Sequence, residues 1–387
     1  MIIICMDETP NNQETQPTVT MPVFNNWEVV AEAWYIALES KDLVKGQARS
    51  INICDHQVTF FRGEDGNVRA VDAYCPHMGT DLGIGKVVGN DIRCMFHHWK
   101  FDGDGQCTDI PCQKEIPLKA RIRSYRVEEK YGFIWIYPAS KSQASLPNHE
   151  ELEDHHHSDI IFKTGLAYER KCHHHVTMIN GIDAQHLRTV HGIQIHMDLD
   201  LKEKSDEDIM DFTLRGAIPQ SNLKEKMARI FLGSSYEYKM RYAAGSIGYL
   251  TMMKNVYFLG KPWLKLPELY MIFAYRPENK RQRTFVQPIY VTQQRKGILG
   301  FLLSNFLLWL TKRAFYSLQD EDGLIYENIR FFPNSLLPLD RPVSKFIDYV
   351  NHLRPSLWSK QTHPTQETNN MRHVESKKRN HNEENRL

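Results

Sequence analysis

"YCPHMGTDLGIGKVVGNDIRCMFHHWKF", residues 74–101, gathers two cysteines and three histidines into one short stretch. Cys75 and His77 form a C-x-H motif, and Cys94 and His97 form a C-x-x-H motif, with sixteen residues between the two motifs. Each motif follows a predicted β-hairpin, so two tight loops would hold a metal site from opposite sides. One interpretation is a structural zinc ion with two sulfur and two nitrogen ligands. The other is a [2Fe–2S] cluster whose histidine-bound iron raises the reduction potential.

The composition limits the class of protein. A chain of 387 residues is long enough for about two domains. Its 41% hydrophobic and 25% charged residues indicate a globular protein, and a net charge of +1 argues against binding to nucleic acid. Seven cysteines argue against a secreted disulfide framework. The first ten residues, "MIIICMDETP", lack the basic region of a signal peptide, so we expect a cytoplasmic protein.

The pattern of predicted secondary structure changes near residue 145. Residues 27–145 contain short β-type segments separated by turn residues, whereas residues 146–358 mix helical and strand patterns. The polar segments 1–26 and 359–387 are predicted to be a disordered arm and tail. The predicted fold class is therefore α+β, with an all-β domain followed by an α+β domain.

A second set of metal-binding residue types lies in "NGIDAQHLRTVH", residues 180–191, which the pattern predicts to be helical. Asp183 and His186 are three residues apart and share a helix face, whereas His186 and His191 are five apart and diverge on an ideal helix. Two imidazoles and one carboxylate form the facial triad of non-haem Fe(II), which leaves positions open for O2 and substrate. The alternative is a polar helix with two incidental histidines.

Taken together, the two motifs and the following W-x-F-D-x-x-G-x-C pattern resemble the Rieske-type non-haem iron oxygenases, specifically their terminal oxygenase (alpha) component. Within that family the motifs look most like those of aminopyrrolnitrin oxygenase, ketosteroid 9α-hydroxylase and cholesterol 7-desaturase. Two positions depart from the family pattern, since Met95 stands where proline is common and His98 where glycine is usual.

The resemblance implies a Rieske [2Fe–2S] domain over residues 27–145 and a helix-grip-type α+β catalytic domain over residues 146–358. It further implies that Asn180 and Asp183 are catalytic residues and that "LQDEDGLIYENI" supplies the third ligand of a mononuclear Fe(II). In the family pattern this ligand aligns with Asp322, with Asp320 as the second choice. The implied ligands are Cys75, His77, Cys94 and His97 for the cluster, and His186, His191 and Asp322 for the mononuclear iron.

The resemblance also implies an activity and partners. The expected enzyme uses O2 and two electrons to hydroxylate, N-oxygenate or desaturate an apolar, aromatic or steroid-like metabolite, by monooxygenation or dioxygenation. No G-x-G-x-x-G motif is present in the sequence, so a separate ferredoxin or NAD(P)H reductase would supply the electrons. Family members are homotrimers in which the residue at Asp183 bridges His186 to His97 of a neighbouring subunit. The alternative from another class is an electron-transfer protein whose second domain only binds a ligand.

An apolar segment, "GILGFLLSNFLLWL" at residues 297–310, is too short to span a bilayer, because 14 helical residues measure about 21 Å against ~30 Å of hydrocarbon. A buried amphipathic or core helix is the first interpretation. A helix lying on a membrane surface is the second, since two basic pairs, Arg295 with Lys296 and Lys312 with Arg313, flank the segment.

Other histidines and cysteines lack the spacing of metal ligands. We expect the histidine runs at 155–157 and 173–175 to be solvated, with His175 lining the cavity as the alternative for that residue. Cys107 and Cys112 are expected to be ordinary buried cysteines.

Overall fold

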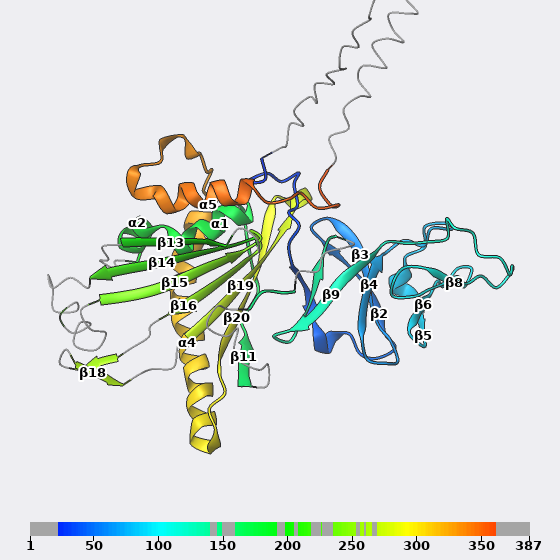
Figure 1. Ribbon diagram of the computed structural model, residues 1–387, viewed down its shortest axis with the longest axis horizontal. Helices are drawn as coiled ribbons and strands as arrows, with labels where there is room; N and C mark the ends of the chain where they lie inside the picture. The colour runs from blue at the N-terminus through cyan, green and yellow to red at the C-terminus, as the bar shows by residue number, and fades with distance from the viewer. Residues whose placement is uncertain are drawn as a thin grey trace, which may run out of the picture.

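The computed structural model contains the predicted all-β domain followed by an α+β domain, which confirms the predicted fold class (Figure 1). The histidine run at 155–157 lies outside the described residues. The structure describes residues 22–139, 145–148, 159–191, 198–204, 208–217, 226, 235–252, 256–258, 261–264 and 269–360.

The first domain consists of two antiparallel sheets. The larger sheet has the strand order β1-β10-β9-β4-β3-β2, and the smaller one has the order β5-β6-β7-β8. The predicted turn after β3 forms at Gly66, whose φ of 84° favours glycine. The strands are β1 (Tyr35–Glu39), β2 (Ala48–Ile53), β3 (His56–Arg62), β4 (Val68–Asp72), β5 (Lys86–Val88), β6 (Asp91–Arg93), β7 (Lys100–Phe101), β8 (Cys107–Asp109), β9 (Ser124–Lys130) and β10 (Phe133–Tyr137).

The second domain is built on an antiparallel sheet with the order β11-β20-β19-β16-β15-β14-β13, in which β12 also pairs with β20. A separate hairpin joins β17 and β18. The strands are β11 (Ile160–Thr164), β12 (Tyr168–Arg170), β13 (Asp198–Lys204), β14 (Ile209–Ala217), β15 (Ser235–Ala243), β16 (Ile247–Met252), β17 (Val256–Phe258), β18 (Lys261–Leu264), β19 (Leu269–Glu278) and β20 (Arg283–Gln293).

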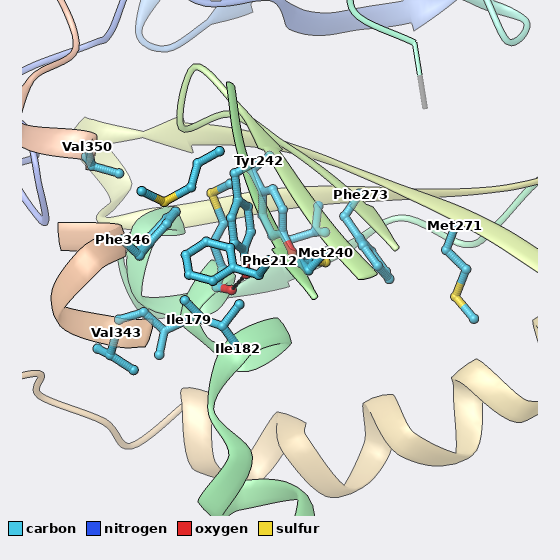
Figure 2. Packing of buried hydrophobic residues seen from close by; sticks show 14 of the residues in the cluster. Ile179, Ile182, Phe212, Met240, Tyr242, Met271, Phe273, Val343, Phe346 and Val350 are labelled. Atoms are coloured by element: carbon cyan, nitrogen blue, oxygen red, sulfur yellow. Dashed lines mark hydrogen bonds between the residues drawn. The ribbon is translucent and has the colours of Figure 1, made fainter. Parts of the chain in front are cut away.

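Helices pack against this sheet. The long helix α4 packs along β11, β19 and β20, whereas α1 packs on β19 and α5 on β14. Figure 2 shows Phe346 of α5 and Ile179 of α1 facing Phe212 and Tyr242 of the sheet, within one buried apolar cluster. The helices are α1 (His174–Ile179), α2 (Ala184–Thr189), α4 (Gly297–Tyr326) and α5 (Arg341–Asn351).

The sequence pattern predicts one continuous helix over residues 180–191. This prediction is wrong, because the segment is divided in two. Helix α1 ends at Ile179, a 3₁₀ turn covers Asn180–Ile182, and α2 begins at Ala184 with Asp183 as its N-cap. A β-carbon at Gly181 would lie 2.7 Å from Cε of Met240, so glycine allows this turn to approach the sheet closely. Because α2 ends at Thr189, His191 lies beyond the helix and is not bound by helical spacing.

Both ends of the described chain pack against folded structure. The prediction of a disordered arm is wrong for residues 22–26, because Val23 is buried and the Phe24 amide donates to Oδ1 of Asn351. At the other end, residues 354–360 return to the first domain. Trp358 is buried there and stacks on His56, 5.1 Å between ring centroids.

Two further expectations about burial are wrong. Cys107 is buried as expected, but Cys112 is exposed. The apolar segment at 297–310 forms the first half of α4, yet most of its large side chains face solvent instead of a core. The reason is that the sheet covers only one side of this half of the helix.

Candidate metal centres

Two loops of the first domain carry the cysteine–histidine motifs. The first follows β4 and is held by two hydrogen bonds of 2.9 Å, from the Cys75 amide to the Thr80 carbonyl and from the Gly79 amide to the Cys75 carbonyl. The second follows β6, and there the Cys94 amide donates to the Trp99 carbonyl, also at 2.9 Å. Backbone hydrogen bonding therefore fixes both loops, and the amides of His77 and Met78 also donate to the sulfur of Cys75.

The four donors of these loops divide into two pairs. Cys75 and Cys94 are buried next to each other, and burial raises the pKa of the Cys75 thiol to about 11. His77 and His97 are exposed, with ring centroids 4.5 Å apart, and His77 also stacks on Trp99.

This pairing fits a two-iron cluster better than a zinc ion. A tetrahedral zinc site requires all four donors around one ion. Among the residues that the structure describes, no three of these four donors belong to a group of ligand atoms within 4.8 Å of one another. A cluster in which sulfur holds one iron and nitrogen the other requires this separation. The Cys75 thiol, whose pKa burial raises, also needs a nearby cation to lose its proton.

The two departures from the family pattern lie beside these ligands and are exposed. His98 adopts a left-handed backbone with a φ of 62°, which explains why glycine is usual at this position. Its side chain is exposed next to His97, and Met95 is 50% exposed.

The second centre lies between the 180–191 motif and α4. Donor atoms of His186, His191 and Asp322 lie within 4.8 Å of one another, and the two imidazoles stand at 81° with centroids 5.2 Å apart. Nε2 of His191 is 3.1 Å from Oδ1 of Asp322, which is buried. Burial lowers the pKa of His186, which keeps this imidazole neutral and able to bind a metal. Two imidazoles and one carboxylate suit non-haem iron.

Hydrogen bonds orient these ligands. Nδ2 of Asn180 donates to Oδ2 of Asp322 at 2.7 Å. Nδ1 of His186 lies 2.5 Å from the main-chain carbonyl of Asp183, which can only accept, so Nδ1 carries the proton. The lone pair on Nε2 of His186 is therefore available to a metal.

The family resemblance implies that Asp183 bridges to His186. In the structure, however, the carboxylate of Asp183 does not bind the His186 ring. Its Oδ1 accepts from the amides of Gln185 and His186, and so caps α2. The carbonyl of the same residue holds the ring instead. One carboxylate oxygen thus fixes the start of the ligand-bearing helix.

The histidine run at 173–175 is buried, so the expectation that it is solvated is wrong. The N-terminal segment covers it: Phe24 stacks on His175, and Trp27 packs edge-on against His173. Burial lowers the pKa of His173 to about 3, and those of His174 and His175 well below their usual value.

Nitrogens of these three rings lie within 4.8 Å of one another, but the tautomers of two of the rings oppose metal binding. The Asn25 amide donates to Nδ1 of His175, and the His175 amide donates to Nδ1 of His173. In each neutral ring the proton must then lie on Nε2, so neither nitrogen keeps a free lone pair.

Comparison with known proteins agrees with this geometry. Residues 33–126 match the family model of the Rieske [2Fe-2S] domain. The chain is 34% identical over 179 residues to cholesterol 7-desaturase of Hemicentrotus pulcherrimus, which covers 45% of this chain and 38% of that protein. It is 38% identical over 122 residues to a probable 3-ketosteroid-9-alpha-monooxygenase oxygenase component of Rhodococcus rhodochrous, 31% of each chain. Aminopyrrolnitrin oxygenase of Pseudomonas fluorescens is 30% identical over 182 residues, 43% of this chain and 47% of that protein.

The matched segments thus span less than half the length of each of these relatives. Solved structures extend the likeness in fold. NdmB of Pseudomonas putida CBB5 covers 86% of this chain and 93% of its own with a TM-score of 0.62 at 16% identity. Dicamba monooxygenase bound to dicamba covers 83% and 97% with a TM-score of 0.59 at 20% identity.

The first domain is therefore a Rieske [2Fe–2S] domain, and the chain as a whole has the fold of NdmB and dicamba monooxygenase. The predicted resemblance to Rieske-type oxygenases is confirmed, including the three relatives expected from the motifs. Within the described part of the chain, no helix is long and apolar enough to cross a bilayer.

Proposed function

We propose that the chain is the oxygenase component of a Rieske non-haem iron enzyme. It would use O2 and two electrons from an external ferredoxin or reductase to hydroxylate, N-oxygenate or desaturate an apolar small molecule, aromatic or steroid-like. The observation that carries this proposal is the group of His186, His191 and Asp322 in a chain that also has a Rieske domain. An electron carrier with a ligand-binding domain would have no need of this second donor set.

The residues around the second centre have separate roles in this proposal. Iron bound by the three ligands would supply the place where O2 is reduced beside the substrate. His186 and His191 would offer imidazole nitrogens, and Asp322 would balance the positive charge. Asn180 would hold the carboxylate of Asp322 through its 2.7 Å hydrogen bond. The Asp183 carbonyl would keep the His186 ring turned toward the metal.

Electrons would pass between subunits. Helix α2 and the β5–β8 sheet lie on opposite sides of the molecule in Figure 1. The Rieske loops and the second centre of one subunit are therefore far apart. We infer a homotrimer in which His97 of one subunit meets the Asp183 region of the next. Only Oδ1 of Asp183 is used in capping α2, which leaves Oδ2 to accept from a partner imidazole.

Metal content tests the proposal against the electron carrier. Purified protein reconstituted anaerobically with iron and sulfide should contain about three irons per chain, and two would indicate the carrier. Asp322→Ala should lose the mononuclear iron and all turnover while its Rieske spectrum stays intact. Asp320→Ala is the matched variant on the same helix, and it should retain all three irons. If only Asp320→Ala loses the mononuclear iron, the third ligand is Asp320.

A further inference from the structure

The first half of α4 places most of its large apolar side chains in solvent. Its solvent-facing side chains are large and apolar, with Ile298 and Leu299 82% and 83% exposed and Trp309 53% exposed. Phe306 and Trp309 stack on each other on this side. The exposed apolar residues of this half are Ile298, Leu299, Phe301, Leu302, Leu303, Phe306, Trp309 and Leu310.

The buried side of the same half carries two hydroxyl groups. Ser304 is 1% exposed, and its Oγ donates to the Gln293 carbonyl at 3.1 Å. Thr311 is 2% exposed, and its Oγ1 donates to the Leu307 carbonyl at 2.8 Å. Leu307 and Leu308 are buried on this side as well, so both apolar and polar contacts hold the helix, and the exposed apolar side chains take no part in them. A helix that is already packed on one side and still exposes eight large apolar side chains on the other presents an apolar surface that a further apolar phase would cover.

The shape of the apolar surface favours a fluid phase. At 100° per residue the exposed apolar side chains cover about 200° of the helix circumference. In Figure 1 this yellow end of α4 projects beyond the strands beside it. One rigid partner surface would contact one side of such a projection, whereas lipid can surround it on several sides. Trp309 fits this environment, because tryptophan is enriched at membrane–water interfaces.

Charge identifies the kind of lipid surface. Arg295 and Lys296 are exposed at the start of the helix, and Arg313 is exposed at the end of the apolar segment. Basic residues on both sides of an apolar surface complement anionic head groups, and each contributes to binding near a negatively charged leaflet. A single bilayer surface would satisfy both the apolar and the basic groups.

We propose that residues 295–313 dock this protein on the surface of an anionic lipid bilayer, with the apolar face of α4 entering the head-group boundary without crossing the membrane. Asp322 lies on the same helix, about 18 Å beyond Leu310 at 1.5 Å per residue. The docked helix would therefore hold the second metal centre at a fixed distance from the lipid. A consequence that rests on the proposed function is that an apolar substrate would be drawn from the bilayer.

Vesicle flotation of the full-length protein with its metal centres in place tests the docking, and it requires no turnover. Wild type should float with vesicles of phosphatidylcholine and phosphatidylserine. Leu299→Glu should bind the vesicles at least about tenfold more weakly than wild type, because a leucine is no longer buried in lipid. Leu118→Glu is the matched control, since Leu118 is fully exposed in the first domain, and it should bind like wild type. The Rieske absorbance of each variant shows that it is folded.

A second variant separates the charge contribution. Replacing both Arg295 and Lys296 with glutamine should lower binding to the anionic vesicles about tenfold or more, and leave the weaker binding to phosphatidylcholine vesicles unchanged. The proposal is overturned if wild type does not float, or if Leu299→Glu binds as wild type does. It is also overturned if Leu299→Glu dissociates an oligomer in lipid-free sedimentation velocity, because the face would then join copies of this chain. Loss of turnover alone would affect the proposed function and leave the docking result standing.

Discussion

Nδ2 of Asn180 donates a 2.7 Å hydrogen bond to Oδ2 of Asp322 across 142 residues of sequence. This contact joins the turn after α1 to the C-terminal end of α4, and it leaves Oδ1 of Asp322 beside His191. A residue that binds no metal thus determines which carboxylate oxygen faces the centre.

Replacing Asn180 should therefore weaken metal binding without removing a ligand. We expect Asn180→Ala to bind mononuclear iron ~10–100-fold more weakly, as is usual when a partner of a metal ligand is lost. Titration of the apoprotein with Fe(II) under anaerobic conditions measures this change. Asn52→Ala, at an exposed position on β2, is the control and should bind iron like wild type. Equal affinity in Asn180→Ala would mean that the hydrogen bond does not position Asp322.

The Rieske loops make a separate prediction. Cys75→Ser should lose the red-brown absorbance and the paramagnetic signal of the reduced cluster, because the iron held by sulfur loses a ligand. Cys107→Ser is a matched control, since Cys107 is also buried in the first domain and its thiol donates to the Asp109 carbonyl. Colour should survive in that variant. A colourless wild type that contains zinc would contradict the assignment of the cluster.

Asp183→Asn distinguishes a bridge between subunits from a local role. The Asp183 carbonyl that holds His186 is unchanged by this substitution, and an amide oxygen can still cap α2. We therefore expect both metal sites to fill and the Rieske centre to be reduced normally. Oxidation of that centre in a single turnover with substrate and O2 should nearly stop. Normal single-turnover rates, or an active monomer in solution, would rule out the bridge.

The buried histidine run predicts a pH dependence of stability. Burial lowers the pKa of His173 to about 3, whereas the unfolded chain takes up the proton near pH 6.5. The unfolded state therefore binds more protons below pH 6.5, and the fold loses stability as the pH falls from there toward 3. At pH 5 one such histidine lowers the free energy of unfolding by about 2 kcal/mol.

Denaturant titrations at pH 7 and pH 5, followed by circular dichroism, measure this loss. His173→Asn cannot take up a proton, so its midpoint should fall less between the two pH values than that of wild type. Only the difference between the two proteins is diagnostic, because other acidic and basic groups contribute equally to both. Equal pH slopes would contradict the prediction.

The spacing of ligand residues within short motifs accounts for most of what the sequence predicts about the metal centres. C-x-H and C-x-x-H place their donors within single loops, so the sequence alone indicates which residues can meet. The helix over residues 180–191 could not be placed correctly, because the capping interaction of Asp183 interrupts it. That interruption removes the divergence of His186 and His191 that regular helical spacing would impose.

Burial was harder to predict, because it depends on distant segments. His175 is covered by residues about 150 positions earlier, through the Asn25 amide and the Phe24 ring. No periodicity near residue 175 records that contact. The exposed side of α4 is the reverse case, because a segment that the sequence suggests is buried lacks a covering segment. An apolar run predicts burial only when the sheet extends far enough to cover it. Composition cannot indicate where the sheet ends.

The return of residues 354–360 to the first domain has a consequence for dividing this protein. Nε1 of Trp358 donates to the Tyr125 hydroxyl at 3.1 Å, and the Ser356 amide donates to the Val30 carbonyl at 2.7 Å. Because Val23 also packs in the core of the second domain, the chain passes between the domains more than twice, and the Rieske domain takes part of its interior from the last described residues. A fragment that stops after β10 would lack Trp358 and expose the His56 and Tyr125 rings that it covers. Conversely, one proteolytic cut after β10 would leave the domains held together by the packing of Val23 on the second domain and of residues 354–360 on the first.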